Sequence, residues 1–187
     1  VVKKTSLPDG SSARYTYDDA HRLIKIEDGE GARIEYTLDA MGNRTAENIY
    51  DPSSTLVRTR TQVFNSLNQL WKQIGAAGTA AVTTTYAYDN NSNPTSTAAP
   101  LLRTTGQLYD ELNRLKQITD PGSGTTLFGY DANDNLTSVT DPKGLITGYT
   151  YNGFGDLTQQ VSPDTGTTVN TYDSGGNLQT RTDGRGE

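Results

Sequence analysis

The chain has 187 residues, a formal net charge of −6 and no cysteine. The lack of cysteine excludes a disulfide framework and thiolate metal ligands, and scattered basic residues in an acidic chain argue against nucleic acid as a partner. No apolar run approaches the roughly 20 residues that a membrane-spanning helix needs, so we expect no membrane span. A mean hydropathy of −0.68 would fit a disordered chain. The 11 tyrosines, however, recur at regular intervals and favour a folded, strand-rich chain.

The first copy of the recurring pattern begins at Arg14. Tyr15 and Tyr17 alternate with polar residues, which is the period of a half-buried strand. Asp18 to His21 has the composition of a turn, residues 23–27 predict a returning strand, and residues 28–31 predict the next turn. One copy is therefore predicted to be a β-hairpin plus a connector, about 21 residues long.

The middle of the chain follows this pattern less regularly. Leu38 stands where a tyrosine is expected, and the next copies, at Phe64 and Tyr88, come later than the period requires. Insertions in repeat proteins usually fall in loops. We therefore assign the extra residues to connectors at residues 51–54 and 75–78.

Two segments of the middle region carry unusual residues. Residues 70–74, which include Trp71, predict the returning strand of the third copy. After Tyr88 the turn ends in Pro94, where other copies have leucine, and Pro100 lies nearby. Because proline has no N–H group to donate, we expect the strand after Tyr88 to be broken or displaced.

From residue 101 onward the pattern is regular. A Tyr-Asp or Tyr-Asn pair returns every 21 residues, with a leucine six residues after each tyrosine. A fixed period of this length is typical of repeat architectures. We count about eight copies and predict a structural role for the repeated residues. These are Tyr17, Asp18, Tyr88, Asp89, Tyr109, Asp110, Tyr130, Asp131, Tyr151, Asn152, Tyr172, Asp173, Leu115, Leu136, Leu157 and Leu178.

The tyrosines allow two interpretations. Tyrosines two residues apart share a face of a strand, and stacked copies would line them into cross-strand ladders worth about 0.2–1 kcal/mol per pair. Such ladders either supply packing or form a stacking platform for sugar rings, for which Tyr86, Tyr88, Tyr149 and Tyr151 are the candidates. The Asp or Asn that follows each repeated tyrosine is expected to accept hydrogen bonds from backbone N–H groups of its own turn.

No catalytic or metal-binding motif is present. The turns that begin at Asp89 and Asp131 start like a calcium loop but lack the glycine and glutamate required at the sixth and twelfth positions. His21, the only histidine, lies in a turn, and a transition-metal site would need further His or Cys ligands. Nucleophile-elbow, P-loop and zinc-protease motifs are missing from the sequence. We therefore predict no catalytic residue, no cofactor and no metal.

The repeated motif resembles that of RHS/YD-repeat proteins, whose consensus is roughly Tyr-x-Tyr-Asp-x-x-Gly-x-Leu followed by Asp-Pro-x-Gly. The resemblance is carried by residues 15–23, 109–115, 141–144 and 149–157. It implies a strip of β-hairpins that winds as a spiral sheet. In bacterial Rhs proteins and the BC components of Tc toxins that sheet closes into a hollow shell around a C-terminal toxin, and teneurins use a similar shell for adhesion.

The resemblance also raises the question of self-cleavage. Family members often release the enclosed C-terminus just after a segment that contains Asp-Pro-x-Gly-Leu, which residues 141–145 match. A further copy follows at Tyr149, and no core-ending aromatic segment precedes the match. We interpret residues 141–145 as an internal connector.

We therefore predict an all-β repeat array of antiparallel hairpins in a curved spiral sheet, part of an RHS-type β-shell. Residues 1–187 are expected to be one repeat segment of a longer chain, irregular over residues 38–100 and regular over residues 101–187. The predicted function is a non-catalytic wall of a secreted or bacterial cell-surface toxin-delivery protein. Its expected partners are the C-terminal toxin and neighbouring repeats. The alternative is a carbohydrate-binding or adhesion module that holds surface glycans on exposed tyrosines. Leu115 and Ile118 are three residues apart and would lie on opposite faces unless a bulge intervenes.

Overall fold

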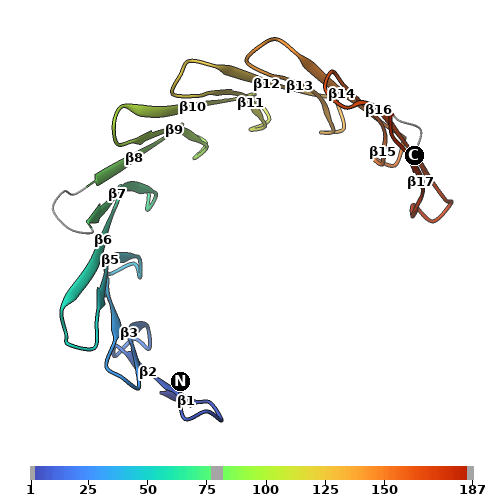
Figure 1. Cartoon of the computed structure of the whole chain (residues 1–187). Helices are drawn as coiled ribbons and strands as arrows, with labels where there is room; N and C mark the ends of the chain where they lie inside the picture. The colour runs from blue at the N-terminus through green and yellow to red at the C-terminus, as the bar shows by residue number, and fades with distance from the viewer. Residues whose placement is uncertain (1–2, 77–81, 185–187) are drawn as a thin grey trace. The chain divides into compact units, whose positions relative to one another are not determined.

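The computed structural model describes residues 3–76 and 82–184, and over these ranges the chain forms strands, turns and no helix (Figure 1). A helix long and apolar enough to cross a membrane is accordingly missing from these residues. The strands are β1 (Lys4–Ser6), β2 (Ser12–Tyr17), β3 (Leu23–Asp28), β4 (Arg33–Leu38), β5 (Arg44–Tyr50), β6 (Leu56–Phe64), β7 (Leu70–Ala76), β8 (Val82–Tyr88), β9 (Pro94–Ala99), β10 (Arg103–Tyr109), β11 (Leu115–Thr119), β12 (Thr125–Tyr130), β13 (Leu136–Thr140), β14 (Ile146–Tyr151), β15 (Leu157–Ser162), β16 (Gly166–Tyr172) and β17 (Leu178–Thr182).

The chain divides into two compact units. The first unit comprises Val1–Tyr88 and Thr97–Arg103, and the second comprises Asp89–Ser96 and Thr104–Glu187. In the first unit, strands β1 to β8 each pair antiparallel with the next strand along the chain. Strands β10 to β17 do the same in the second unit. The predicted all-β array of antiparallel hairpins is confirmed.

Strand register gives each unit two different faces. In the β2–β3 hairpin, Tyr15 pairs with Ile26, while the alternate residue Arg14 pairs with Glu27. Apolar and polar pairs alternate because successive side chains point to opposite faces of a sheet. We call the side that carries the repeated tyrosines the tyrosine face and the other side the threonine face. In the second unit, the register places these residues on the tyrosine face: Tyr109, Leu115, Ile118, Phe128, Tyr130, Leu136, Val139, Tyr149, Tyr151, Leu157, Tyr172 and Leu178.

A β-bulge lies beside each repeated tyrosine whose pairing is described. Tyr109 pairs with Leu115, but the preceding Leu108 pairs with Gln117, so Lys116 is the extra residue. Equivalent shifts recur in the other hairpins of this type. The bulge places Leu115 and Ile118 on the same face, because Ile118 pairs with Gln107, two residues from Tyr109. Sequence spacing without a bulge would have separated them.

The units have no enclosed core in the part of the chain that the structure describes. Over these residues no side chain, apolar or polar, is fully buried. The tyrosine-face residues other than Leu178 are half-buried, and covering half of one large apolar side chain contributes about 1 kcal/mol. Stability therefore comes from many small contacts between neighbouring hairpins, as in other repeat proteins.

The extra residues of the third copy lengthen strands rather than loops. Residues 51–55 form a loop of the same length and backbone hydrogen bonds as residues 120–124, so the prediction of a longer connector there was wrong. The added residues lie in β5 and β6, which have 7 and 9 residues, and an additional bulge between Ile49 and Tyr50 absorbs the odd residue. Gly75 belongs to β7, and residues 77–78 of the second expected connector lie outside the described residues.

The strand after Tyr88 is neither broken nor displaced, contrary to the prediction. Strand β9 begins at Pro94 and continues to Ala99, immediately before Pro100. Proline is tolerated as the first residue of a strand because no ladder hydrogen bond is required from its nitrogen there. The two prolines therefore bound this strand instead of disrupting it.

Candidate functional site

The repeated residues meet in one recurring loop, which we call the Tyr-Asp loop. In the first copy, the Asp18 N–H donates to the Arg22 carbonyl and the His21 N–H donates to the Asp18 carbonyl, both at 2.9 Å. This is a short hairpin loop whose fourth residue has a left-handed backbone, with φ of 62° at His21. Eight loops of this form directly follow the repeated tyrosine position, which Leu38 and Phe64 occupy in two copies: residues 18–22, 39–43, 65–69, 89–93, 110–114, 131–135, 152–156 and 173–177.

The first side chain of each loop holds the turn together. In residues 131–135, one Asp131 carboxylate oxygen accepts from the backbone N–H groups of Asn133 and Asn135, both at 2.9 Å. The second oxygen accepts from the Asn135 amide at 3.0 Å. These bonds hold the pKa of Asp131 below its ordinary value, and the bond from the Asn135 side chain has the largest effect. The expected bonds from Asp to its own turn are present.

In four of the described loops the fifth side chain also links one copy to the next: Arg22, Asn43, Asn93 and Arg114. In the second unit, Arg114 donates to the Asp110 carboxylate (2.8 Å), to the Asp131 carbonyl (3.0 Å) and to the Asp134 carboxylate (2.7 Å). Its guanidinium carbon also lies 4.8 Å from the centre of the Tyr130 ring. In the first unit, Arg22 makes the same link to the Asp39 carbonyl (3.0 Å). Such bonds join three successive loops in the first unit, from residues 18–22 to 65–69, and three in the second, from residues 89–93 to 131–135.

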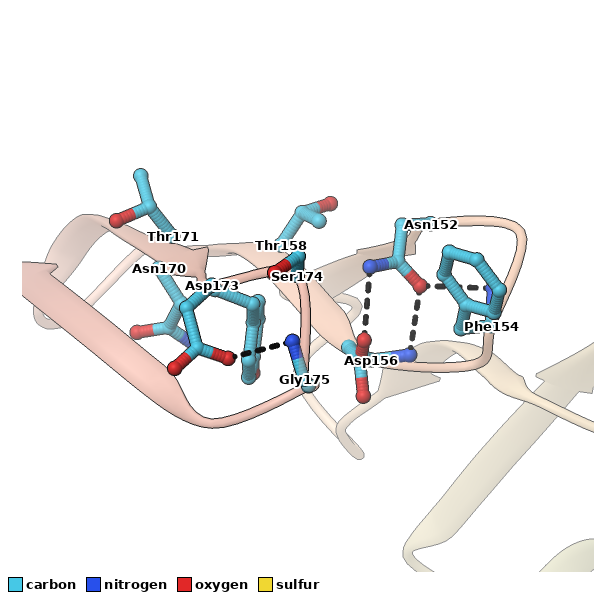
Figure 2. Close-up of a pocket in the computed structure, with 11 residues that line it drawn as sticks. Asn152, Phe154, Asp156, Thr158, Asn170, Thr171, Asp173, Ser174 and Gly175 are labelled. Atoms are coloured by element: carbon cyan, nitrogen blue, oxygen red, sulfur yellow. Dashed lines mark hydrogen bonds between the residues drawn. The ribbon is translucent and has the colours of Figure 1, made fainter.

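Two loops depart from the usual pairing of a carboxylate at the first residue with a donor at the fifth. In residues 152–156, Asn152 opens the loop and its amide N–H donates to the Asp156 carboxylate at 2.8 Å (Figure 2). The acid and the amide have exchanged places, so donors and acceptors still match. In residues 65–69, both ends are amides: Asn65 donates to Gln69 at 2.7 Å, and the buried Gln69 Nε2 has no partner.

Three of the repeated tyrosines, Tyr88, Tyr130 and Tyr172, hydrogen-bond to the preceding hairpin. The Tyr130 hydroxyl donates to the Leu115 carbonyl at 2.9 Å. Tyr88 bonds Leu70 and Tyr172 bonds Leu157 in the same way, also at 2.9 Å. The sequence did not predict these bonds, because each acceptor is a backbone carbonyl that any residue would supply. They tie a ring of one copy to the backbone of the copy before it.

The four sugar-stacking candidates are half-buried instead of exposed. Tyr86, Tyr88, Tyr149 and Tyr151 all lie on the tyrosine face between hairpins, and burial raises the pKa of Tyr151. The Tyr88 hydroxyl is engaged with a backbone carbonyl. We find no open row of rings at these positions, and no observation favours sugar stacking there.

A shallow hollow lies between the loops at residues 152–156 and 173–177 (Figure 2). It is lined by the Asn152–Asp156 pair, by Asp173, which accepts from the Gly175 N–H at 2.9 Å, and by Asn170. The Asn170 amide donates to the Leu157 carbonyl at 2.9 Å, and its oxygen has no partner. Over the described ranges no three His, Cys, Asp or Glu side chains converge as a metal site would require. The hollow offers hydrogen-bonding groups but no nucleophile beside a base.

Comparison with known proteins points to one family. The family described as RHS Repeat matches residues 2–33, 17–55, 109–146 and 130–167, which together make up more than half of the chain. A search of curated proteins gave no match.

Solved structures share the fold. A crystal structure of TcdB2-TccC3-Cdc42 superimposes with a TM-score of 0.71 and 17% identity, over 90% of this chain and 10% of that chain. A Tc holotoxin pore of Photorhabdus luminescens with a mutated TccC3 gives 0.69 and 16%, over 94% and 12%. TcdB2-TccC3 without its hypervariable C-terminal region gives 0.57 and 13%, over 97% and 12%. The chain thus spans about a tenth of the length of the solved chains it matches.

Proposed function

The chain belongs to the RHS repeat family, and from this premise we propose that it is a wall segment of a β-shell in a larger toxin-delivery protein. The segment is a structural element without catalysis of its own. In the full-length protein the shell encloses a C-terminal toxin until delivery, and the protein acts outside the producing cell or at the bacterial surface. Its partners are that toxin and the neighbouring repeats.

One observation carries the proposal: polar atoms of the repeated side chains form hydrogen bonds between neighbouring hairpins. Arg114 bonds three acceptors in two loops, and the Tyr130 hydroxyl bonds the preceding hairpin. A catalytic repeat would leave at least one reactive group directed at a substrate. A repeat whose recurring polar groups bond one another is suited to building a continuous wall.

The thinness of each unit supports the same role. Over the described residues no side chain is fully buried, so each unit is a single layer that encloses nothing by itself. Enclosure of a toxin domain would require many more copies, which fits a chain that matches about a tenth of the solved chains.

Residues 141–145 behave as an internal connector. The Asp141 carboxylate accepts from the backbone N–H groups of Lys143 and Leu145, both at 2.8 Å. The Asp141 N–H donates to the Leu145 carbonyl at 2.9 Å. This is the pattern of the connector loop at residues 120–124, so the site supports a turn rather than self-cleavage.

The test is made on the full-length protein. Intact mass and gel filtration should show a C-terminal fragment or domain that co-elutes with the repeats and resists a protease that digests the same region expressed alone. A C-terminal region cut equally fast in both forms would contradict enclosure. A hydrolytic activity abolished by changing a single carboxylate of residues 1–187 would contradict the non-catalytic role.

A further inference from the structure

Asn152 and Gly153 are the only Asn-Gly pair in the chain, and they open the loop at residues 152–156. Such a pair has a specific reactivity. The glycine nitrogen can attack the asparagine side-chain carbonyl to form a cyclic imide, because no glycine side chain hinders the close approach. Water then opens the imide. The fold decides whether the two groups are held in a position to react.

The loop folds the Asn152 side chain over the Gly153 nitrogen. Asn152 Oδ1 accepts from the Phe154 N–H at 2.9 Å, and this bond closes a ring of atoms that includes the Gly153 nitrogen (Figure 2). The same oxygen accepts from the Asp156 N–H at 3.0 Å. Two N–H donors on one carbonyl oxygen stabilise the negative charge that develops there when a nucleophile attacks the carbonyl carbon. The loop therefore activates the Asn152 side chain towards its own backbone.

The Gly153 nitrogen is open to reaction. Its N–H donates to no partner within residues 3–76 and 82–184. A Cβ built on Gly153 would meet nothing within 4 Å, so the space around this residue is empty. Gly153 is also exposed, and the shallow hollow beside the loop admits the water that opens an imide.

Another copy provides an internal comparison. Asn65 opens the equivalent loop with the same bonds: its Oδ1 accepts from the Leu67 N–H at 3.0 Å and from the Gln69 N–H at 2.9 Å. The next residue is Ser66, whose side chain hinders attack by its nitrogen. The remaining Tyr-Asp loops all begin with aspartate. Asn152 is thus the one first residue of these loops where an amide leaving group precedes an unhindered nitrogen.

We propose that Asn152–Gly153 is a self-modification site, at which the folded chain converts Asn152 to aspartate and isoaspartate without an enzyme. The Gly153 nitrogen loses its proton and bonds to Asn152 Cγ. The Cγ–Nδ2 bond breaks, and Nδ2 leaves as ammonia with one added proton. Water then adds to either imide carbonyl, which gives aspartate or isoaspartate. Water is the only co-reactant, and no atom is oxidised or reduced.

Both products weaken the loop. In the aspartate product a carboxylate faces Asp156, in place of the Asn152 amide that donates to the Asp156 carboxylate at 2.8 Å. In the isoaspartate product the main chain gains one methylene group, so the ring closed by the Phe154 N–H is lost. The reaction therefore loosens the turn between β14 and β15 as the protein ages. This inference does not depend on the proposed wall function.

The experiment ages the full chain in mildly alkaline buffer and follows it by peptide mass mapping and by methylation with an isoaspartyl methyltransferase. The peptide that contains Asn152 should gain about 1 Da and become methylated. The rate should not depend on protein concentration, because the attack is intramolecular. The chain unfolded in urea should react no faster than the folded chain, because it lacks the two N–H donors. A faster reaction in urea would overturn the role assigned to the fold.

Two variants isolate the nitrogen that attacks. Gly153→Ala is the matched control, because the Gly153 backbone lies outside the left-handed region and a Cβ fits there without a clash. It should keep the loop and slow the mass gain severalfold. Ser66→Gly should create the same reaction at Asn65, which in wild type should react much more slowly than Asn152. Equal rates for Gly153→Ala and wild type would overturn the proposal.

Urea unfolding before and after ageing tests the consequence for the loop. Aged wild type should unfold at a lower urea concentration than fresh protein, whereas aged Gly153→Ala should match its fresh form. Asn152→Asp should show the lower stability without ageing, and its peptide should gain no mass. Aged wild type that is fully modified at Asn152 and as stable as fresh protein would contradict the loosening.

Discussion

The Tyr-Asp loops and the connector loops share one backbone conformation but differ at their fifth residue. The fifth residues of the Tyr-Asp loops all have polar side chains that bond the loop's first side chain: Arg22, Asn43, Gln69, Asn93, Arg114, Asn135, Asp156 and Asn177. The fifth residues of the connector loops have no amide or guanidinium group: Ala32, Thr55, Gly124 and Leu145. The backbone conformation therefore needs only the first residue. The fifth residue adds a bond within the loop and, at Arg22, Asn43, Asn93 and Arg114, a bond to the next copy.

The largest expected loss of stability comes from substituting a repeated tyrosine. Tyr130→Ala removes a half-buried ring and its hydrogen bond to Leu115, and should lower the free energy of unfolding by about 2–3 kcal/mol. Tyr130→Phe removes only the hydroxyl and should cost about 1 kcal/mol. Urea unfolding of the full chain measures both, with the exposed Phe154→Asn as control. A loss for Tyr130→Ala no greater than that of the control would contradict the packing role.

One substitution should have opposite effects in two loops. Asn152→Asp places a second carboxylate against Asp156 and should destabilise the chain by about 1 kcal/mol at neutral pH. The loss should diminish in mild acid, where the pair holds a shared proton. Asn65→Asp gives the unpartnered Gln69 amide an acceptor and should stabilise by up to about 1 kcal/mol. Thermal unfolding at two pH values distinguishes the two variants. A change of stability in the same direction for both would contradict the assigned pairing of donors and acceptors in these loops.

Arg114→Ala tests the link between copies directly. The variant loses the ion pairs to Asp110 and Asp134 and the contact with the Tyr130 ring. The melting temperature should fall by a few degrees, and high salt should reduce the difference from wild type because it screens ion pairs. Lys116→Ala, two residues away, is the control and should show a smaller, less salt-dependent change.

The acid sensitivity of the loops has a defined sign. The folded-state pKa of Asp131 is depressed, chiefly by the Asn135 amide. Its contribution is therefore present above the unfolded value of about 3.9 and is lost as pH falls through the lower folded value. Asp131→Asn keeps an oxygen for the Asn133 and Asn135 N–H groups but does not titrate, so stability should fall less steeply below about pH 4. An unchanged slope would show that this carboxylate does not couple to folding.

The smallest expected effect on stability comes from giving a connector loop the fifth residue of a Tyr-Asp loop. Leu145→Asn supplies an amide that can donate to the Asp141 carboxylate and should stabilise by a few tenths of a kcal/mol. Gly124→Asn is the contrasting case, because a Cβ there would lie 2.5 Å from Asp120 Oδ2 and the side chain has no room. Differential scanning calorimetry should place the two variants on opposite sides of wild type.

Much of this fold follows from the sequence because its loops are local. The bonds of Asp18 or Asp131 to their own turns need only residues within five positions, and alternation along Tyr15 and Tyr17 predicts a strand without knowledge of its partners. The 21-residue period then predicts where each successive hairpin begins. These features were predictable since each depends on neighbours in the chain.

What the sequence did not reveal depends on contacts across strands. The bulge that unites Leu115 and Ile118 on one face is a property of pairing register, and spacing alone favoured opposite faces. The longer β5 and β6 strands were mistaken for a longer loop, because an insertion in a hairpin arm and one in a connector have the same length along the chain. The Tyr130 hydroxyl bond crosses to another copy and leaves no mark in the composition of either.

Where the fifth residue of a loop bonds another copy, it reaches only the adjacent loop. Arg114, for example, touches its own loop and the one at residues 131–135. Loss or duplication of one complete copy therefore leaves a single new junction, at which the same kinds of donor and acceptor meet again. Such a chain can change length in steps of one hairpin during evolution while every other copy keeps its contacts.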